Sequence, residues 1–223
     1  GVDGQVDLNL QRFEVFTPDA TVVTGSVNID GDVIHRQLPR PNVVLLKGAI
    51  EGEPSSRVFL AIGEHTANGL IELNGLTYIL AKDKTRGWTT IYNMSDVNPE
   101  DMNWVDFQCG VADAAEPILE KRRKSSERSS LGCQAIQVAI ETDWEFTGDL
   151  FEGNTGASSE YAVTLMGAIS TISNTDLNVG VQVSFLRLWG NPSDPWTNDS
   201  TGTQLAQFRD HWQNDMQRIP RHL

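Results

Sequence analysis

The residues of this chain that could bind a metal ion or act as nucleophiles are two cysteines and four histidines. The cysteines are Cys109 and Cys133, and a cysteine thiolate is a strong ligand for zinc. The histidines are His35, His65, His211 and His222. None of them is followed by glutamate, so the His-Glu-x-x-His pattern of zinc peptidases is absent from the chain. We expect His211 on the flank of a helix rather than on a metal, because it lies beside the apolar Trp212 in a helical pattern.

Short strands dominate the first half of the sequence. Apolar segments follow one another at short intervals and are separated by turn residues. We expect strands over residues 43–50, 57–62, 69–73 and 76–80, with a turn over 51–56. Asn74-Gly75, between the last two strands, is the strongest short signal for a hairpin. These features predict an antiparallel β domain.

The second half alternates strands with helices. Residues 134–141 alternate apolar and polar side chains, and 179–189 form a longer apolar run, so we expect two strands. Residues 160–174 and 203–216 have helical spacing, and Ser158 or Ser159 is the expected N-cap of the first helix. The expected inner face of that helix carries Tyr161, Leu165, Ile169 and Ile172. Two strands and two helices begin an α/β unit but form a thin core, so we expect this half to be unstable alone.

An aromatic loop follows the second of these strands. Residues 189–196 contain two tryptophans and two prolines. The tryptophans could border a substrate cleft or cap the core, and the sequence leaves both interpretations open.

A basic segment separates the two halves. Residues 120–130 are rich in lysine, arginine and serine and have no apolar side chain, so they cannot form a packed core. We therefore predict three parts: a β-rich domain over 1–110, an exposed linker over 111–130 and an α/β part over 131–223. The basic run Lys121, Arg122, Arg123 and Lys124 is a candidate processing site, because proteases cut exposed segments.

The chain as a whole is acidic. Its 223 residues carry a formal net charge of -13, with a pI near 4.6. An acidic surface repels phosphate, so we expect neither nucleic acid nor an anionic membrane as a partner. No apolar run approaches the roughly 18 residues that cross a bilayer. Gly1–Asp7 contains no recognisable signal peptide, which fits either a cytoplasmic protein or one whose leader has been removed.

Three segments resemble a known family. Residues 47–62 and 68–80 look like the prodomain of reprolysin-type (adamalysin) zinc metalloproteases, with its "G-x-v-x-G-x-p-x-S-x-v" and "G-L-x-G-x-i…Y-x-I" patterns. The second glycine of the latter pattern and the family's prodomain cysteine pair are missing, which indicates a simpler, bacterial-type relative. Cys133–Phe146 is similar to the opening strand of metzincin catalytic domains. The resemblance covers residues 43–223. It implies an α+β chain, with a β-rich antiparallel prodomain followed by an incomplete α/β, metzincin-like catalytic subdomain.

Cys109-Gly110-Val111 resembles the cysteine switch that ends such prodomains. A catalytic zinc has three protein ligands and one exchangeable water. The Cys109 thiolate would displace that water and thereby remove the nucleophile, and Gly110 would let the chain pass close to the metal. The resemblance therefore implies zinc as the cofactor, Cys109 as its one ligand from this chain, and the chain's own catalytic domain as partner. A Cys109–Cys133 disulfide and an inert thiol remain alternatives.

The function implied by the resemblance is that of a secreted or extracellular zinc metalloendopeptidase zymogen. This chain would be its N-terminal portion, inactive alone, with the zinc motif beyond Leu223 and a protein or peptide as substrate of the mature enzyme. One alternative is a non-catalytic β module that binds or inhibits a protease. Another is a β-rich adhesion or structural protein. Asn93 and Asn198 begin glycosylation sequons, and we carry over no calcium site.

Overall fold

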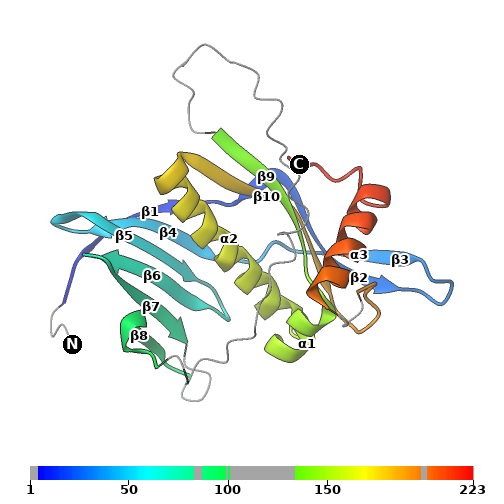
Figure 1. The fold of residues 1–223 in the computed structure, drawn as a ribbon, viewed down its shortest axis with the longest axis horizontal. Coiled ribbons are helices and arrows are strands. Elements are labelled where there is room, and N and C mark those ends of the chain that lie inside the picture. Colours follow the sequence, from blue (N-terminus) through cyan, green and yellow to red (C-terminus); the bar gives the residue numbers. More distant parts are fainter. Residues whose placement is uncertain (1–4, 83–86, 99, 101–133, 197–199, 223) are drawn as a thin grey trace, which may run out of the picture.

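The computed structural model describes residues 5–82, 87–98, 100, 134–196 and 200–222 (Figure 1). These ranges contain ten β-strands in two sheets, three α-helices and one short 3-10 helix, η1 (Met94–Asp96). The chain is therefore α+β, as the sequence predicts. None of the α-helices in these ranges combines the length and apolar character that crossing a bilayer requires.

The larger sheet has six strands and is antiparallel throughout. Its order is β1 (Leu8–Phe13), β4 (Val44–Ile50), β5 (Glu53–Ile62), β6 (Ala67–Leu73), β7 (Leu76–Lys82) and β8 (Thr89–Asn93). The strands expected near 43–50, 57–62, 69–73 and 76–80 are all confirmed. In the hairpin between β6 and β7, Asn74 and Gly75 both have positive φ, 52° and 77°, which a type I′ turn requires.

The turn expected over 51–56 is shorter in the structure. Only Glu51 and Gly52 turn, and β5 begins at Glu53. Pro54 is tolerated inside β5 because the pairing with β6 begins only at Arg57. The register with β4 also shifts near this point, so no ladder bond depends on the N–H that proline lacks.

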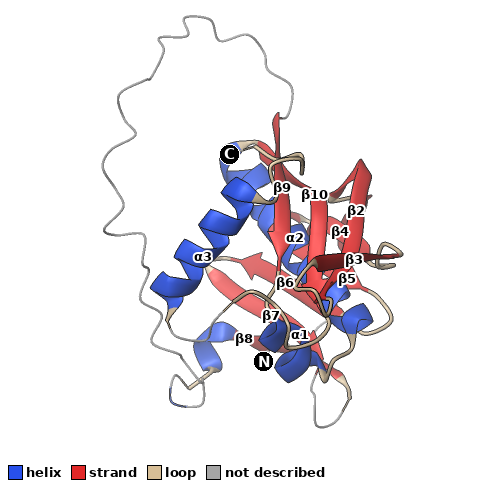
Figure 2. Ribbon diagram, turned by 90° about the vertical axis from the view of Figure 1, so that its right-hand side faces the viewer, coloured by secondary structure: helices blue, strands red, loops and turns tan. Residues whose placement is uncertain are grey.

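The smaller sheet combines strands from both ends of the sequence. Its order is β3 (Val33–Leu38), β2 (Phe16–Val27), β10 (Val179–Trp189) and β9 (Gln134–Glu141). Strand β10 runs parallel to β2 on one side and to β9 on the other, whereas β2 and β3 are antiparallel. The expected strands over 134–141 and 179–189 are confirmed. Strands β2 and β3 were not predicted, nor was the pairing of β2 with β10 from the second half (Figure 2).

Helices cover both faces of the smaller sheet. Helices α1 (Trp144–Phe151) and α2 (Thr155–Leu177) connect β9 to β10, and α2 packs between β10 and strands β4, β5 and β6. Helix α3 (Thr201–Asn214) lies on the opposite face of the sheet. A single core cluster joins the two sheets through α2: Val15, Val22, Val43, Leu45, Phe59, Ala61, Ala162, Val163, Val183, Leu186 and Leu188. The second half thus packs α2 against strands of the first.

The start of α2 differs from the sequence-based expectation. The N-cap is Asn154, whose side chain accepts a hydrogen bond from the N–H of Ala157, rather than Ser158 or Ser159. The two serines lie buried inside the first turn, where their hydroxyls donate to backbone carbonyls of that turn. The helix therefore begins five residues before Glu160 and ends at Leu177.

The expected inner face of α2 is also wrong. Tyr161, Leu165, Ile169 and Ile172 are 36 to 49% exposed. The buried positions are mainly small: Ser158, Ser159, Ala162, Val163, Thr164, Gly167, Ser170 and Thr171. The reason is that α2 lies between two sheets, and only small side chains allow its backbone to approach both. At Gly167 a Cβ atom would lie 2.9 Å from the ring of Phe59.

We predict that Gly167→Ala destabilises the protein by about 1–3 kcal/mol, because the buried Phe59 ring and Leu45 leave no room for the methyl group. Gly202→Ala in α3 is the matched control, since nothing lies within 4 Å of that site. There the higher helix propensity of alanine should raise stability by up to about 1 kcal/mol. Urea unfolding of both variants gives the comparison, and a stabilised Gly167→Ala protein would contradict the close packing of α2.

Candidate functional site

A buried ion pair joins the two parallel strands β9 and β10. Arg187 lies in the middle of an apolar strand, and Glu141 is its direct partner in the β9–β10 register. Both side chains are at most 1% exposed. The Arg187 Nε donates to Glu141 Oε1 at 2.6 Å, and Nη2 pairs with the same oxygen. Charges buried this deeply are costly unless they are paired and hydrogen-bonded.

Two indoles complete the hydrogen bonding of Glu141. Trp189 Nε1 donates to Oε1 and Trp212 Nε1 donates to Oε2, each at 2.8 Å. Both carboxylate oxygens are thus occupied by donors from β10 and α3. This arrangement makes Glu141 an anchor between elements, since it has no free oxygen to act as a general base.

The outer side of the Arg187 guanidinium faces two histidines. Nη1 lies 2.9 Å from His35 Nε2 on β3, and Nη2 contacts His211 Nε2 on α3. Arginine can only donate, so both of these ring nitrogens must be unprotonated acceptors. His211 then carries its proton on Nδ1, which lies 2.8 Å from Asp215 Oδ2. We refer to Glu141, Arg187, Trp189, Trp212, His35 and His211 as the Arg187 network.

The environment shifts the ionisation of two members of this network. Burial lowers the pKa of His35, and the charges of Arg187 and His211 lower it further. Burial also lowers the pKa of Arg187, while Glu141 and Asp215 act in the opposite direction. An arginine stays protonated at neutral pH even so. The network therefore favours the neutral form of His35 beside a permanent cation.

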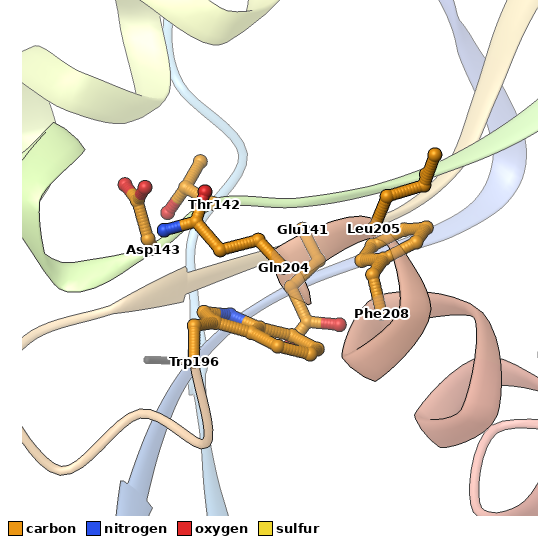
Figure 3. A pocket seen from close by; sticks show the side chains of 7 residues that line it. All are labelled: Glu141, Thr142, Asp143, Trp196, Gln204, Leu205 and Phe208. Carbon is orange, nitrogen blue, oxygen red and sulfur yellow. The ribbon is translucent and has the colours of Figure 1, made fainter. Parts of the chain in front are cut away.

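A shallow pocket opens beside the network, with a volume of about 250 Å³ (Figure 3). It is lined by Glu141, Thr142, Asp143, Trp196, Gln204, Leu205 and Phe208. The acidic groups that border it are already engaged, because Asp143 accepts from the N–H of Phe146 as the N-cap of α1. The pocket thus presents mainly apolar and amide surface.

The two tryptophans of the aromatic loop lie in different surroundings, one in the core and one at the pocket. Trp189 is fully buried and belongs to the core. Trp196 borders the pocket, where its ring lies 5.7 Å from that of Phe208 and 5.6 Å from that of His211. Asp194 in the same loop accepts a hydrogen bond from the N–H of Trp144 at 2.9 Å. Burial raises the pKa of Asp194 despite this bond, and the nearby Glu145 and Asp143 raise it further.

The switch and processing-site residues predicted from the sequence all lie outside the described residues, as does Cys133, the alternative partner of Cys109: Cys109, Gly110, Lys121, Arg122, Arg123, Lys124 and Cys133. Within the described ranges, no three side chains of histidine, cysteine, aspartate or glutamate are grouped to hold a metal ion. His211 is on a helix and only 12% exposed, and His35 joins it at Arg187. His222 lies elsewhere, where its Nδ1 accepts from the N–H of Gln137.

The Arg187 network itself was not predicted. One sequence signal could have indicated it, namely a single arginine inside the apolar run 179–189. Its partners come from three distant segments, which no local pattern connects. Comparison with protein-family models and with curated proteins finds no match for this chain.

Arg187→Met should destabilise the protein by about 3–5 kcal/mol, because it leaves the Glu141 carboxylate buried without its countercharge. Adding Glu141→Gln should recover part of that loss, since it removes the unpaired charge while the amide oxygen can still accept from one of the two indoles. Denaturant unfolding followed by tryptophan fluorescence measures both. Arg12→Met serves as the control, because the exposed Arg12–Glu14 pair should contribute under about 1 kcal/mol. A loss in Arg187→Met as small as that of the control would rule out the anchoring role.

Asp194→Asn should stabilise the protein at neutral pH. The folded state raises the pKa of Asp194, so this group's contribution to stability is complete below the ordinary value of 3.8 and is lost as pH rises through the raised value. Asparagine removes that loss and can still accept from the N–H of Trp144. The measurement is the unfolding free energy between pH 3 and pH 8. Asp19→Asn, at an exposed position of β2, is the control, and an equal gain in stability from both substitutions would contradict the role of burial at Asp194.

Proposed function

We propose that this chain is the N-terminal part of a secreted zinc metalloendopeptidase zymogen, whose first segment keeps the catalytic part latent. One observation carries the proposal. Strand β9, helices α1 and α2, parallel strand β10 and helix α3 alternate as in an α/β unit, the architecture that the metzincin resemblance implies for the start of the catalytic part. The finer assignment of 131–223 as a truncated metzincin subdomain belongs to this proposal.

The contact between the two segments supports a restraining role for the first. Strand β2 pairs with β10 over Thr21–Gly25, and the main core cluster contains residues from both segments. Cleavage at residues 121–124 would cut the chain without breaking these contacts. Processing would therefore leave the first segment bound until a further event releases it.

In the proposed mechanism the zinc would supply an activated water for attack on a peptide carbonyl. This chain would contribute the inhibitory ligand, because the Cys109 thiolate would occupy the position of that water. Gly110 would allow the close approach, and Lys121, Arg122, Arg123 and Lys124 would offer the processing site. Protein or peptide substrates would be bound by the mature enzyme.

The proposal predicts that the coding sequence after Leu223 contains H-E-x-x-H-x-x-G-x-x-H, and that the precursor binds one zinc per chain. In that precursor, Cys109→Ser should raise peptidase activity by about tenfold or more, because the thiolate no longer excludes water from the zinc. Cys133→Ser is the control. No change in Cys133→Ser supports a switch, whereas an equal rise in both variants indicates a disulfide. A stop codon directly after Leu223 would exclude a hydrolase of this kind.

A non-catalytic inhibitory module is the second candidate. Exposed apolar side chains on β5, β7 and β8 favour a docking role for the larger sheet: Ile62, Leu76, Ile91 and Tyr92. This function predicts that the whole chain inhibits a mature metzincin protease added in trans. Equal inhibition by the Cys109→Ser chain would remove the thiol from that mechanism.

A further inference from the structure

The guanidinium of Arg187 connects two segments that lie 176 positions apart, since His35 is on β3 and His211 is on α3. In the described part of the chain, β3 is an edge strand that pairs with β2 alone. The bond from Arg187 to His35 is thus a side-chain attachment of this edge strand to the face of the sheet that α3 covers. The ring of His35 also lies 6.3 Å from that of Phe185, which belongs to the cluster beneath α3.

We propose that His35 and His211 form an acid-released lock that holds the β2–β3 hairpin against α3. In the locked state both imidazoles are neutral and accept hydrogen bonds from Arg187. Protonation at Nε2 removes the acceptor on each ring and places new cations against the guanidinium. The hairpin then loses its attachment to α3 while its backbone pairing with β10 remains.

The charges around Arg187 favour release on acidification. Glu141 faces the guanidinium from β9, and Asp215 faces it from the C-terminal end of α3. Strand β2 contributes Val23, which carries no charge, and the segment after α3 contributes the Met216 thioether at 3.5 Å. With neutral histidines, two carboxylates face one cation, whereas protonation of both histidines gives three cations against the same two carboxylates.

The position of the entering proton follows from the hydrogen bonds. Asp215 accepts from Nδ1 of His211 and thus already fixes the proton on that nitrogen. The proton gained in acid must therefore enter at Nε2, the atom that faces Arg187. For His35, burial and the neighbouring cation lower the pKa in the locked state. The released state keeps the ordinary value of 6.5, so the locked state loses stability relative to it as pH falls below 6.5.

The lock does not depend on the proposed protease function, because none of its groups is a candidate zinc ligand or cleavage site. Were both to hold, acidification would loosen the restraining segment from the catalytic part after processing. This would provide the further event that separates the two segments.

Hydrogen exchange of the whole chain between pH 7.5 and pH 5, corrected for intrinsic exchange rates, tests the lock. Protection of the amides of β3 should fall by about tenfold on acidification, because the bonds to a charged group are lost. Protection of β5 and β6 in the larger sheet should stay within about twofold and serves as the internal reference. An equal loss of protection in both sheets would indicate global acid unfolding and overturn the lock.

Substitutions of the two histidines distinguish the effect of their protonation from other effects of low pH. His35→Gln with His211→Gln supplies amide oxygens that accept from Arg187 at every pH, so β3 should remain protected at pH 5. His65→Gln is the matched control, since this histidine lies between β5 and β6 outside the network, and it should retain the wild-type response. If the double variant opens at pH 5 as the wild type does, the histidines are not the lock. If the double variant fails to fold, the single His35→Gln variant, changed at an exposed edge strand, should still reduce the pH response of β3.

Discussion

The buried pair of Arg187 and Glu141 is the interaction on which the arrangement of the second half depends. An arginine inside an apolar strand requires a countercharge, and Glu141 supplies it across the β9–β10 register. The carboxylate in turn requires donors, which the indoles of Trp189 and Trp212 provide. Because Trp212 belongs to α3, the ion pair also fixes where that helix lies on the sheet. An alternative position of α3 would leave a buried carboxylate oxygen without a partner, at a cost of about 1–3 kcal/mol or more.

The second constraint is the position of α2 between two sheets. A helix packed on both sides can bury small side chains on two faces, while its large apolar residues are displaced toward the surface. Gly167 lies where Phe59 and Leu45 come closest, and Ala162 and Val163 enter the same cluster as Val183 and Leu186. The resulting core belongs to neither half of the sequence. We infer that the two halves stabilise each other, which explains how a part with few elements of its own can be folded here.

These two constraints give the proposed latent state a physical basis. A restraining segment that contributes strands to a sheet and residues to a core remains bound after a backbone cut. Its release requires a change that weakens specific contacts. The Arg187 network is suited to such a change, because two of the acceptors that hold its guanidinium are imidazole nitrogens, which a proton would convert to donors. Strand β3, which His35 attaches to Arg187, is therefore the part that would separate first.

The sequence by itself determined the local elements of this protein. Alternation in residues 134–141 defined β9, Asn74-Gly75 defined a hairpin, and the apolar run 179–189 defined β10, because these signals depend on neighbours along the chain. It did not determine which side of α2 is buried, that β2 joins β10, or that His35 and His211 meet at Arg187. Helical spacing identifies a stripe of large apolar residues along a helix. In α2 that stripe is not buried, because the helix backbone must lie close to two sheets and only small side chains fit between them. Pairing between strands about 160 residues apart depends on the shared core. Only the tertiary structure decided these features, because burial and long-range contact are properties of the assembled layers and not of any segment.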